Sequence, residues 1–193
     1  MFTSVQESIL AREPRDLLAE GAGNDDPDLL TAYALLISSS IHDINVLRGA
    51  LGQPEAVLSA SLWAGGTSFT ATLAYANEVR ANYTWTLVPH LKNYSQTFSF
   101  HGSDARVDIR FPSPYLRNAP THVDLERMHG DELEQTRLTV SYEEAFKQEL
   151  LEFHACMQTG GNPRTDAAGF RQDLDVLTGI ARQLVERTQR PHA

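Results

Sequence analysis

The chain has 193 residues, of which 41% are hydrophobic and 21% are charged, and its formal net charge is -9. This length and composition fit one globular domain with a core large enough to fold without disulfides or metals. The acidic balance, without a basic cluster, argues against nucleic acid or an anionic membrane surface as a partner.

The targeting and redox features of the sequence predict a cytoplasmic protein. The N-terminus, MFTSVQESIL, has neither the basic start nor the long apolar core of a secretory signal. No apolar run approaches the roughly 20 residues that a membrane-spanning helix needs. The single cysteine, Cys156, cannot form an internal disulfide, as is usual for proteins of the cytoplasm.

Two regions are expected along the chain. Residues 1–28 are expected to be an N-terminal arm or loop, and residues 29–193 an α+β domain. The boundary follows from GAGNDDPD, because Gly, Asn, Asp and Pro favour a loop that ends where a helix starts. Pro27 suits the first helical turn, and the acidic residues beside it complement the helix dipole.

Apolar residues then recur at helical spacing from Leu29 to Leu51, and Gly52 and Pro54 end the pattern. Ser38–Ser40 interrupt it with three side chains that compete for backbone hydrogen bonds. We therefore predict two helices separated by a break or tight bend at these serines.

Seven short runs rich in β-branched and aromatic residues follow. They are Ala56–Trp63, Phe69–Tyr75, Val79–Leu87, Tyr94–His101, Ala105–Phe111, Thr121–Met128 and Leu133–Val140. In the second run Phe69, Ala71 and Leu73 alternate with more polar neighbours, as in a strand. The connections are short, which requires mostly antiparallel pairing. The sequence therefore predicts a large, open, predominantly antiparallel sheet.

The chain ends in two predicted helices, Tyr142–Met157 and Asp166–Arg187, the first with a capping pattern at Ser141. The apolar stripe of the first helix comprises Ala145, Phe146, Leu150, Phe153 and Met157. Helices at both ends of a series of strands predict an α+β fold with helices packed on one sheet face. The other face has no cover within the chain, so we expect a homodimer or larger homo-oligomer formed through it.

Several chemical motifs are missing from the sequence. No strand is followed by Gly-x-Gly-x-x-Gly, and no phosphate-binding loop of the Walker type occurs. Closely spaced cysteines or histidines for a metal are missing as well. We therefore expect no cofactor-binding residues and no metal in this chain.

The sharpest local feature is the run SSSIHDINVLRGALG, residues 38–52. His42 lies at the predicted helix break beside Asp43 and Ser38, where an imidazole can exchange protons near neutral pH. We name these three as candidate catalytic residues. The alternative is that His42 caps the second helix or bonds a neighbouring carbonyl group.

This run resembles the catalytic helix of the glucose–fructose oxidoreductase, inositol dehydrogenase and related family (Gfo/Idh/MocA). Further loose matches occur in the same order along the chain, and the resemblance covers roughly Leu30–Leu184. These matches are QPEAV at 53–57, FHGS at 100–103, SYEEAF at 141–146 and TGG-x-P at 159–163. The resemblance implies a dihydrodipicolinate-reductase-like C-terminal domain that binds substrate and dimerises. It also implies NAD or NADP as cofactor, bound by a Rossmann domain that this chain lacks. In the family, that Rossmann domain also carries the catalytic Lys, within a Glu-Lys-Pro motif.

In the family, the His that matches His42 serves as acid and base for a sugar hydroxyl. Two positions depart from the pattern, because Ser38 stands where an Asp usually assists and Asn45 stands where an acid follows the His. Neither replacement can carry charge, so a changed reaction, or none, stays open. Asn45 is instead a candidate substrate-binding residue.

A proline-stiffened loop supplies the other candidates. Tyr115, Arg117 and Asn118 lie within Pro112–Pro120, and the family places substrate contacts on this loop. The alternative is that the Tyr packs on the sheet. For a second aromatic group, Trp63, Tyr83 and Trp85, a place in the core or at a dimer face is favoured over a sugar platform.

Three functional hypotheses follow. The first is the substrate-binding and oligomerisation part of an NAD(P)-dependent oxidoreductase, acting on a sugar, cyclitol or related polyol. It would need a Rossmann domain from a separate chain or a longer protein, so the chain alone is not expected to be redox-active. The second is a non-redox ligand-binding module or acid/base catalyst that uses His42 and Asp43. The third is a structural dimerisation subunit.

Overall fold

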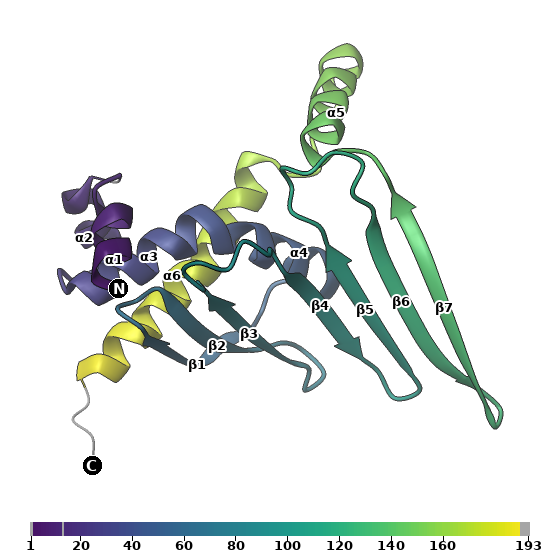
Figure 1. The fold of residues 1–193 in the computed structure, drawn as a ribbon, viewed down its shortest axis with the longest axis horizontal. Coiled ribbons are helices and arrows are strands. Elements are labelled where there is room, and N and C mark those ends of the chain that lie inside the picture. The colour runs from purple at the N-terminus through teal and green to yellow at the C-terminus, as the bar shows by residue number, and fades with distance from the viewer. Residues whose placement is uncertain (1, 13, 190–193) are drawn as a thin grey trace. The chain divides into compact units, whose positions relative to one another are not determined.

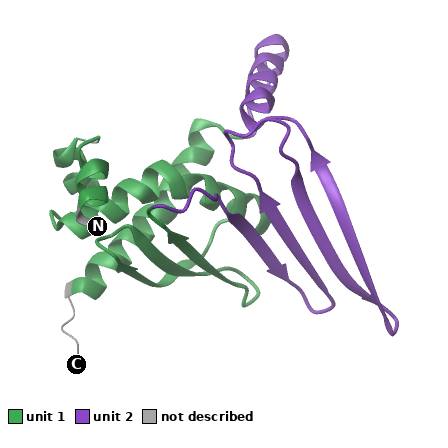
Figure 2. Ribbon diagram, viewed as in Figure 1, with its two compact units in different colours: residues 1–89, 165–193 green, residues 90–164 purple. Residues whose placement is uncertain are grey.

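The computed structural model describes residues 2–12 and 14–189, which divide into two compact units (Figures 1 and 2). Unit 1 holds the described residues up to 89 and those from 165 onward, and unit 2 holds residues 90–164. Each unit has its own antiparallel sheet.

Unit 1 combines helices from both ends of the chain with three strands. Its elements are α1 (Phe2–Leu10), α2 (Arg15–Ala22), α3 (Pro27–Leu35), a π-helical turn (Leu36–Ser40), α4 (Ile41–Leu51), β1 (Ala56–Trp63), β2 (Ser68–Ala74), β3 (Arg80–Thr86) and α6 (Ala167–Gln189). The strands are ordered β1-β2-β3, and α6 packs along β1 (Figure 1). In the N-terminal segment, Leu18 and Ala22 of α2 pack with Leu30 and Ala34 of α3.

The helix predicted from residue 29 begins where its sequence signals place it. The Asp26 carboxylate accepts hydrogen bonds from the backbone N–H groups of Asp28 and Leu29, at 2.9 and 3.2 Å, and Pro27 occupies the first turn. The predicted break at Ser38–Ser40 is instead a π-helical turn, so the helix runs through to Leu51. A π turn accommodates the interruption because it widens the helix locally without ending its hydrogen bonding.

The continuous helix Pro27–Leu51 has 25 residues and is long and apolar enough to cross a membrane by length and composition, which differs from the expectation that no apolar run is long enough. However, 56% of its most apolar window is buried inside the fold. Leu30, Leu36 and Ile44 are fully buried there. These contacts are those of a helix at the centre of a protein core.

The three-stranded sheet has the alternation that the sequence predicts. Phe69, Ala71 and Leu73 are buried on one face of β2, and the register places Tyr83 and Trp85 of β3 on that same face. The opposite face is polar and carries cross-strand contacts, such as that between the hydroxyl groups of Thr70 and Thr84 at 3.0 Å. The buried face therefore belongs to the core of unit 1.

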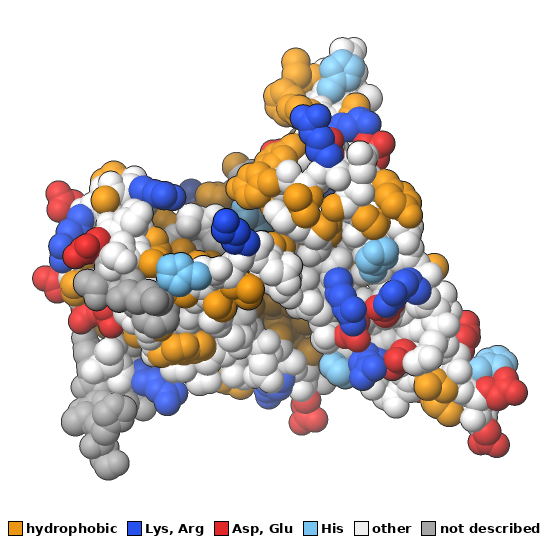
Figure 3. Space-filling view, in the orientation of Figure 1, with side chains coloured by type: hydrophobic (Ala, Val, Ile, Leu, Met, Phe, Trp, Pro, Cys, Tyr) orange, Lys and Arg blue, Asp and Glu red, His pale blue; other side chains and the backbone are white. Residues whose placement is uncertain are grey.

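Unit 2 is a four-stranded sheet followed by one helix. Its elements are β4 (Gln96–His101), β5 (Ala105–Phe111), β6 (Thr121–His129), β7 (Glu132–Ser141) and α5 (Ala145–Thr159), with strand order β4-β5-β6-β7. The register gives one apolar face, which includes the row Phe98, Ile109, Val123 and Leu138. The other face is charged, and Figure 3 shows its acidic and basic side chains gathered over the middle strands.

These observations confirm the predicted α+β class. The predicted strands form two sheets, because β3 and β4 do not pair in the described structure. Between them Pro89 has no backbone N–H to donate, and His90 has a φ of 78°. Helix α5 starts at Ala145, later than predicted, because Ser141 still belongs to β7.

Candidate functional site

The candidate catalytic residues lie at the start of α4. His42 and Asp43 occupy its first turn, directly after the π-helical turn, and the His42 side chain is exposed while Asp43 is half-buried. Ser38 is exposed within the π turn, and its hydroxyl donates to the carbonyl oxygen of Ala34 at 2.6 Å. Single π turns within helices occur frequently at functional sites, and here the turn directly precedes the imidazole.

Strand β3 positions this part of the helix through two hydrogen bonds. The buried hydroxyl of Tyr83 donates to Oδ2 of Asp43 at 2.7 Å. The indole N–H of Trp85 donates to the hydroxyl oxygen of Ser39 at 3.1 Å. The two donors are two residues apart on one face of the strand, so together they hold the π turn and the first turn of α4 on the sheet.

Core packing fixes the two donor rings. Phe69 stacks on Trp85 with ring centroids 5.7 Å apart and planes 9° apart. The same Phe69 ring lies 6.3 Å from the ring of Tyr83. Aromatic pairs at these separations are favourable beyond their burial, so the hydroxyl and indole groups are held in place.

This arrangement suits acid/base chemistry at a surface. An exposed imidazole can exchange protons with a ligand, and the neighbouring carboxylate is oriented by a buried donor. Sequence reasoning placed Tyr83 in the core and overlooked its hydrogen bond to Asp43. The available signal was the shared strand face of Tyr83 and Trp85, which points both polar groups at the helix that covers the sheet.

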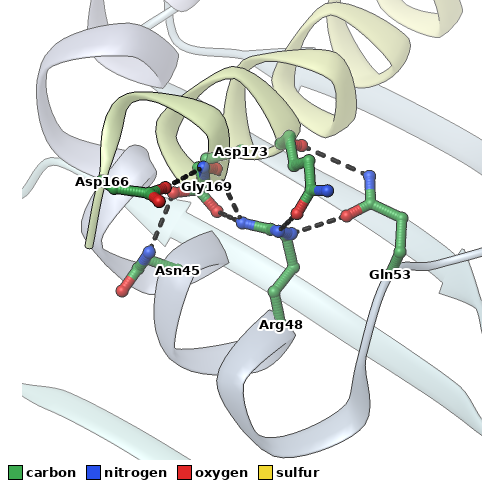
Figure 4. A network of polar contacts seen from close by, with 7 residues as sticks. Asn45, Arg48, Gln53, Asp166, Gly169 and Asp173 are labelled. Atoms are coloured by element: carbon green, nitrogen blue, oxygen red, sulfur yellow. Dashed lines mark hydrogen bonds and ion pairs between the residues drawn. The ribbon is translucent and has the colours of Figure 1, made fainter. Parts of the chain in front are cut away.

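Asn45 lies one turn further along α4 and points to a different set of partners (Figure 4). Its amide donates to Oδ2 of the buried Asp173 at 2.9 Å. Arg48 forms an ion pair with the same carboxylate and donates to the carbonyl oxygen of Gly169 at 3.0 Å. This network fastens α4 to α6, and the Asn45 amide takes part in it.

Burial raises the pKa of the Tyr75 hydroxyl, an effect that the positive charge of Arg48 partly opposes.

The loop candidates belong to unit 2 and form a separate group. Tyr115, Arg117 and Asn118 are all exposed between β5 and β6. The Tyr115 ring lies 5.9 Å from that of Phe146 in α5, and the Arg117 guanidinium is 3.7 Å from the Glu144 carboxylate. The structure therefore brings Tyr115 and Arg117 to the start of α5, while Asn118 is placed only by the loop that they share, and all three lie in a different unit from His42.

The described residues offer no fit for a dinucleotide. Gly65 and Gly66 lie in the hairpin between β1 and β2, and Gly160 ends α5 in a left-handed conformation. Neither position joins a strand to the N-terminus of a helix, where the phosphates of a dinucleotide bind. Among residues 2–12 and 14–189, no group of three or more His, Cys, Asp or Glu side chains could hold a metal ion.

Comparison with solved structures identifies similar folds. A mutant of KijD10, a 3-ketoreductase from Actinomadura kijaniata in complex with TDP-benzene and NADP, has a TM-score of 0.61 at 18% identity, covering 76% of this chain and 46% of that one. UDP-N-acetylglucosamine 3-dehydrogenase GnnA from Acidithiobacillus ferrooxidans has a TM-score of 0.61 at 16% identity. The match covers 77% of this chain and 46% of GnnA. A protein from Desulfitobacterium hafniense assigned as an NADPH-dependent oxidoreductase has a TM-score of 0.66 at 14% identity. The match covers 80% of this chain and 47% of that protein.

No protein-family model and no curated protein sequence matches the chain. The similar structures are oxidoreductases of the Gfo/Idh/MocA type, so the resemblance read from the sequence is confirmed for the fold. The chain spans less than half the length of the three proteins named above.

Proposed function

We propose that this chain is the substrate-binding and oligomerisation part of an NAD(P)-dependent oxidoreductase that acts on a CH–OH group of a sugar, cyclitol or related polyol. The proposal proceeds from the fold, which is similar to that of oxidoreductases about twice as long. The observation that carries it is the π turn that places exposed His42 beside Asp43, whose carboxylate accepts from Tyr83.

In the proposed reaction His42 exchanges the proton of the substrate hydroxyl, because its imidazole is exposed to a bound ligand. Asp43, oriented by the buried Tyr83 hydroxyl, supports the positive charge that His42 then gains. Ser38 supplies a neutral hydroxyl one turn earlier in the helix. The dinucleotide belongs to a domain outside the residues described, either in a separate chain or in a longer protein.

The substrate class follows from the names of the similar proteins. KijD10 is described with TDP-benzene bound, and GnnA is named for a nucleotide-linked sugar. We extend this class to the present chain, with Tyr115, Arg117 and Asn118 contacting the ligand. Their exposed positions on one loop leave an aromatic ring, a guanidinium and an amide available to a sugar nucleotide. We place the protein in the cytoplasm, where such nucleotides and nicotinamide cofactors occur.

A second copy is the expected partner on the polar face of the three-stranded sheet, opposite the helices. That face presents Ser61, Thr70 and Thr84 in one cross-strand row and Ser59, Thr72 and Asn82 in the next. A surface of short hydroxyl side chains allows the close approach of another sheet, and a closed two-fold pair needs only this one self-complementary patch.

The test is ligand binding by the chain itself. Thermal unfolding is measured with UDP-N-acetylglucosamine, TDP, myo-inositol and glucose, since a ligand that binds only the folded state raises the melting temperature. A rise with the sugar nucleotide that is weakened in His42→Ala supports the proposed role of His42. A separate weakening in Tyr115→Ala supports the loop of unit 2 as a ligand contact. The matched control is His154→Ala, an exposed His on α5 that should leave binding unchanged.

One observation favours a second candidate, a non-redox ligand-binding module or acid/base catalyst. The described residues hold no dinucleotide loop, and neither Ser38 nor Asn45 carries charge. Turnover of a bound sugar without nicotinamide, lost in His42→Ala, would favour this candidate over the oxidoreductase. If none of the probes raises the melting temperature, a structural dimerisation subunit remains and both ligand-based proposals fail.

A further inference from the structure

Helix α5 presents a row of large apolar side chains to solvent. Phe146, Leu150, Phe153 and Met157 are 50%, 68%, 61% and 68% exposed. No residue of this 15-residue helix is buried. The sequence pattern predicts such a stripe but leaves open what the stripe packs against. Within unit 2 the Tyr115 ring lies 5.9 Å from that of Phe146, and all four side chains remain at least half exposed.

The spacing of the four side chains is informative. They follow one another at intervals of four, three and four residues along the helix. This is the 3.5-residue period of a coiled-coil seam, in which alternate positions of one helix fit between those of a neighbouring helix. The partner that this surface fits is therefore another helix with the same period.

The opposite side of α5 is already engaged within unit 2. The Glu152 carboxylate accepts hydrogen bonds from the backbone N–H and the guanidinium of Arg164, at 2.8 and 2.6 Å. Lys147, which flanks the apolar row, pairs with Glu143 just before the helix begins. Figure 2 shows α5 projecting beyond the end of the four-stranded sheet of unit 2.

We infer that α5 pairs with α5 of a second copy of this chain through Phe146, Leu150, Phe153 and Met157, which we call the α5 seam. A row that is identical on both helices is self-complementary under a two-fold axis, because each side chain faces a position of the same kind. Pairing removes from water four large apolar side chains on each helix.

The residues beside the seam permit this pairing. The flanking positions hold Lys147, Glu149, His154 and Cys156, so one acid and one base stand beside the apolar row. Identical helices with a block of like charges would repel one another, whereas this mixed set does not. In a parallel pair, Glu149 of one copy faces His154 of the other, five residues further along.

The α5 seam covers only about two heptads, so we expect the contact between two copies to be weak. Isolated helices of this length are marginal in water, so the pair depends on the sheet that anchors each helix. The association is therefore expected to depend on concentration. This interface is distinct from the polar sheet face proposed above, and it involves different residues.

Sedimentation velocity over a concentration series tests the inference. Leu150→Glu places a charge in the seam and should weaken self-association about tenfold or more. Leu151→Glu is the matched control, because Leu151 is the adjacent residue, is also 53% exposed and lies outside the seam. The control should leave the association constant within about twofold. Both positions are exposed, and circular dichroism checks that each variant keeps its helix content.

Hydrogen exchange locates the contact. Amides of α5 should gain protection as the wild-type concentration rises and should gain none in Leu150→Glu. The inference is overturned if the α5 amides of the wild type gain no protection as the molecules associate, because the copies then meet elsewhere, for example on the polar sheet face. It is also overturned if the wild type remains monomeric up to about 1 mM, since the seam would then serve a different partner.

Discussion

The hydroxyl of Tyr83 donates a hydrogen bond of 2.7 Å to the carboxylate of Asp43, although 40 residues separate them in the chain. The donor belongs to the buried face of β3, and the acceptor lies in the first turn of α4 beside exposed His42. A contact of this kind fixes the carboxylate from the core side and leaves the neighbouring imidazole open to solvent. The sheet thereby sets the geometry of the surface at which the proposed chemistry takes place.

Removal of this hydroxyl tests its contribution to the fold. Tyr83→Phe keeps the ring beside Phe69 and removes only the donor, so we expect a loss of about 1 kcal/mol in the free energy of unfolding. Urea denaturation measures the change, and Tyr115→Phe is the control because that ring is 81% exposed. A double-mutant cycle with Asp43→Ala should give a coupling energy of about 1 kcal/mol. Strict additivity of the two substitutions would contradict the assigned bond.

Local sequence patterns predict most of the helices and strands but few of the contacts that these elements make with one another. The runs Ala56–Trp63 and Ala105–Phe111 match β1 and β5 because alternation and short connections are properties of neighbouring residues. The serines at 38–40 do perturb the helix, but whether a perturbed helix ends or widens depends on what packs around it. The apolar stripe with Phe153 is visible in the sequence, whereas its exposure is not.

The candidate site shows the same division between local and distant information. His42 and Asp43 could be named from adjacent residues and from a family resemblance. Their structural surroundings could not, because Tyr83 reaches Asp43 from a distant strand and Asp173 reaches Asn45 across 128 positions. Contacts at such separations follow from how the helices pack, and no spacing rule in a single sequence encodes them.

The ion pair between Arg48 and Asp173 should carry a large share of the stability of unit 1. Asp173 is 1% exposed, and Asp173→Asn removes the charge that compensates the Arg48 guanidinium. Loss of one partner from a buried pair leaves an unpaired charge, so we expect a cost of about 3 kcal/mol in the free energy of unfolding. Asp175→Asn, at an exposed position of the same helix, should cost less than about 0.5 kcal/mol. Chemical denaturation of both variants measures these losses in the free energy of unfolding. Equal losses in the two variants would exclude a stabilising role for the ion pair.

The charged face of unit 2 predicts a measurable pH dependence. A hydrogen bond from Arg137, followed by its positive charge and that of Arg110, lowers the pKa of Asp124 below its ordinary value of 3.8. A carboxylate with a lowered folded-state pKa adds stability at pH values above 3.8, and that stability is lost as the pH falls through the lowered pKa. In Arg137→Ala the pKa of Asp124 should rise toward 3.8 in a carboxyl NMR titration.

The control for this titration lies further along the same strand pair, β6 and β7. Arg127 lowers the pKa of Glu134, so Arg127→Ala should raise the pKa of Glu134 and leave that of Asp124 unchanged. Both shifts should shrink in high salt, because these side chains are accessible to mobile ions. An Asp124 pKa that does not respond to Arg137→Ala would exclude the assigned pairing.

The hairpin between β1 and β2 meets the start of α3 at a point where only glycine fits. Gly66 has a φ of 74°, and its α-carbon lies so close to Asp28 that an added Cβ would overlap the Asp28 carbonyl oxygen. On the same side, the Gln6 amide donates to the Asp28 carboxylate at 2.7 Å and to the Gly65 carbonyl oxygen at 3.0 Å. The hairpin, α1 and α3 therefore converge on Asp28.

Gly66→Ala should accordingly be among the most destabilising single substitutions in unit 1. The Cβ must displace the backbone of α3 while the residue keeps a left-handed conformation, so we expect a loss of about 3 kcal/mol or more in the free energy of unfolding. Gly23→Ala measures the cost of the left-handed backbone alone, without a steric overlap, because Gly23 has a φ of 66° and nothing lies within 4 Å of an added Cβ. That control should cost about 1 kcal/mol. Thermal and urea unfolding of the two variants measure the difference, and similar losses would mean that the hairpin does not approach α3 as closely as described.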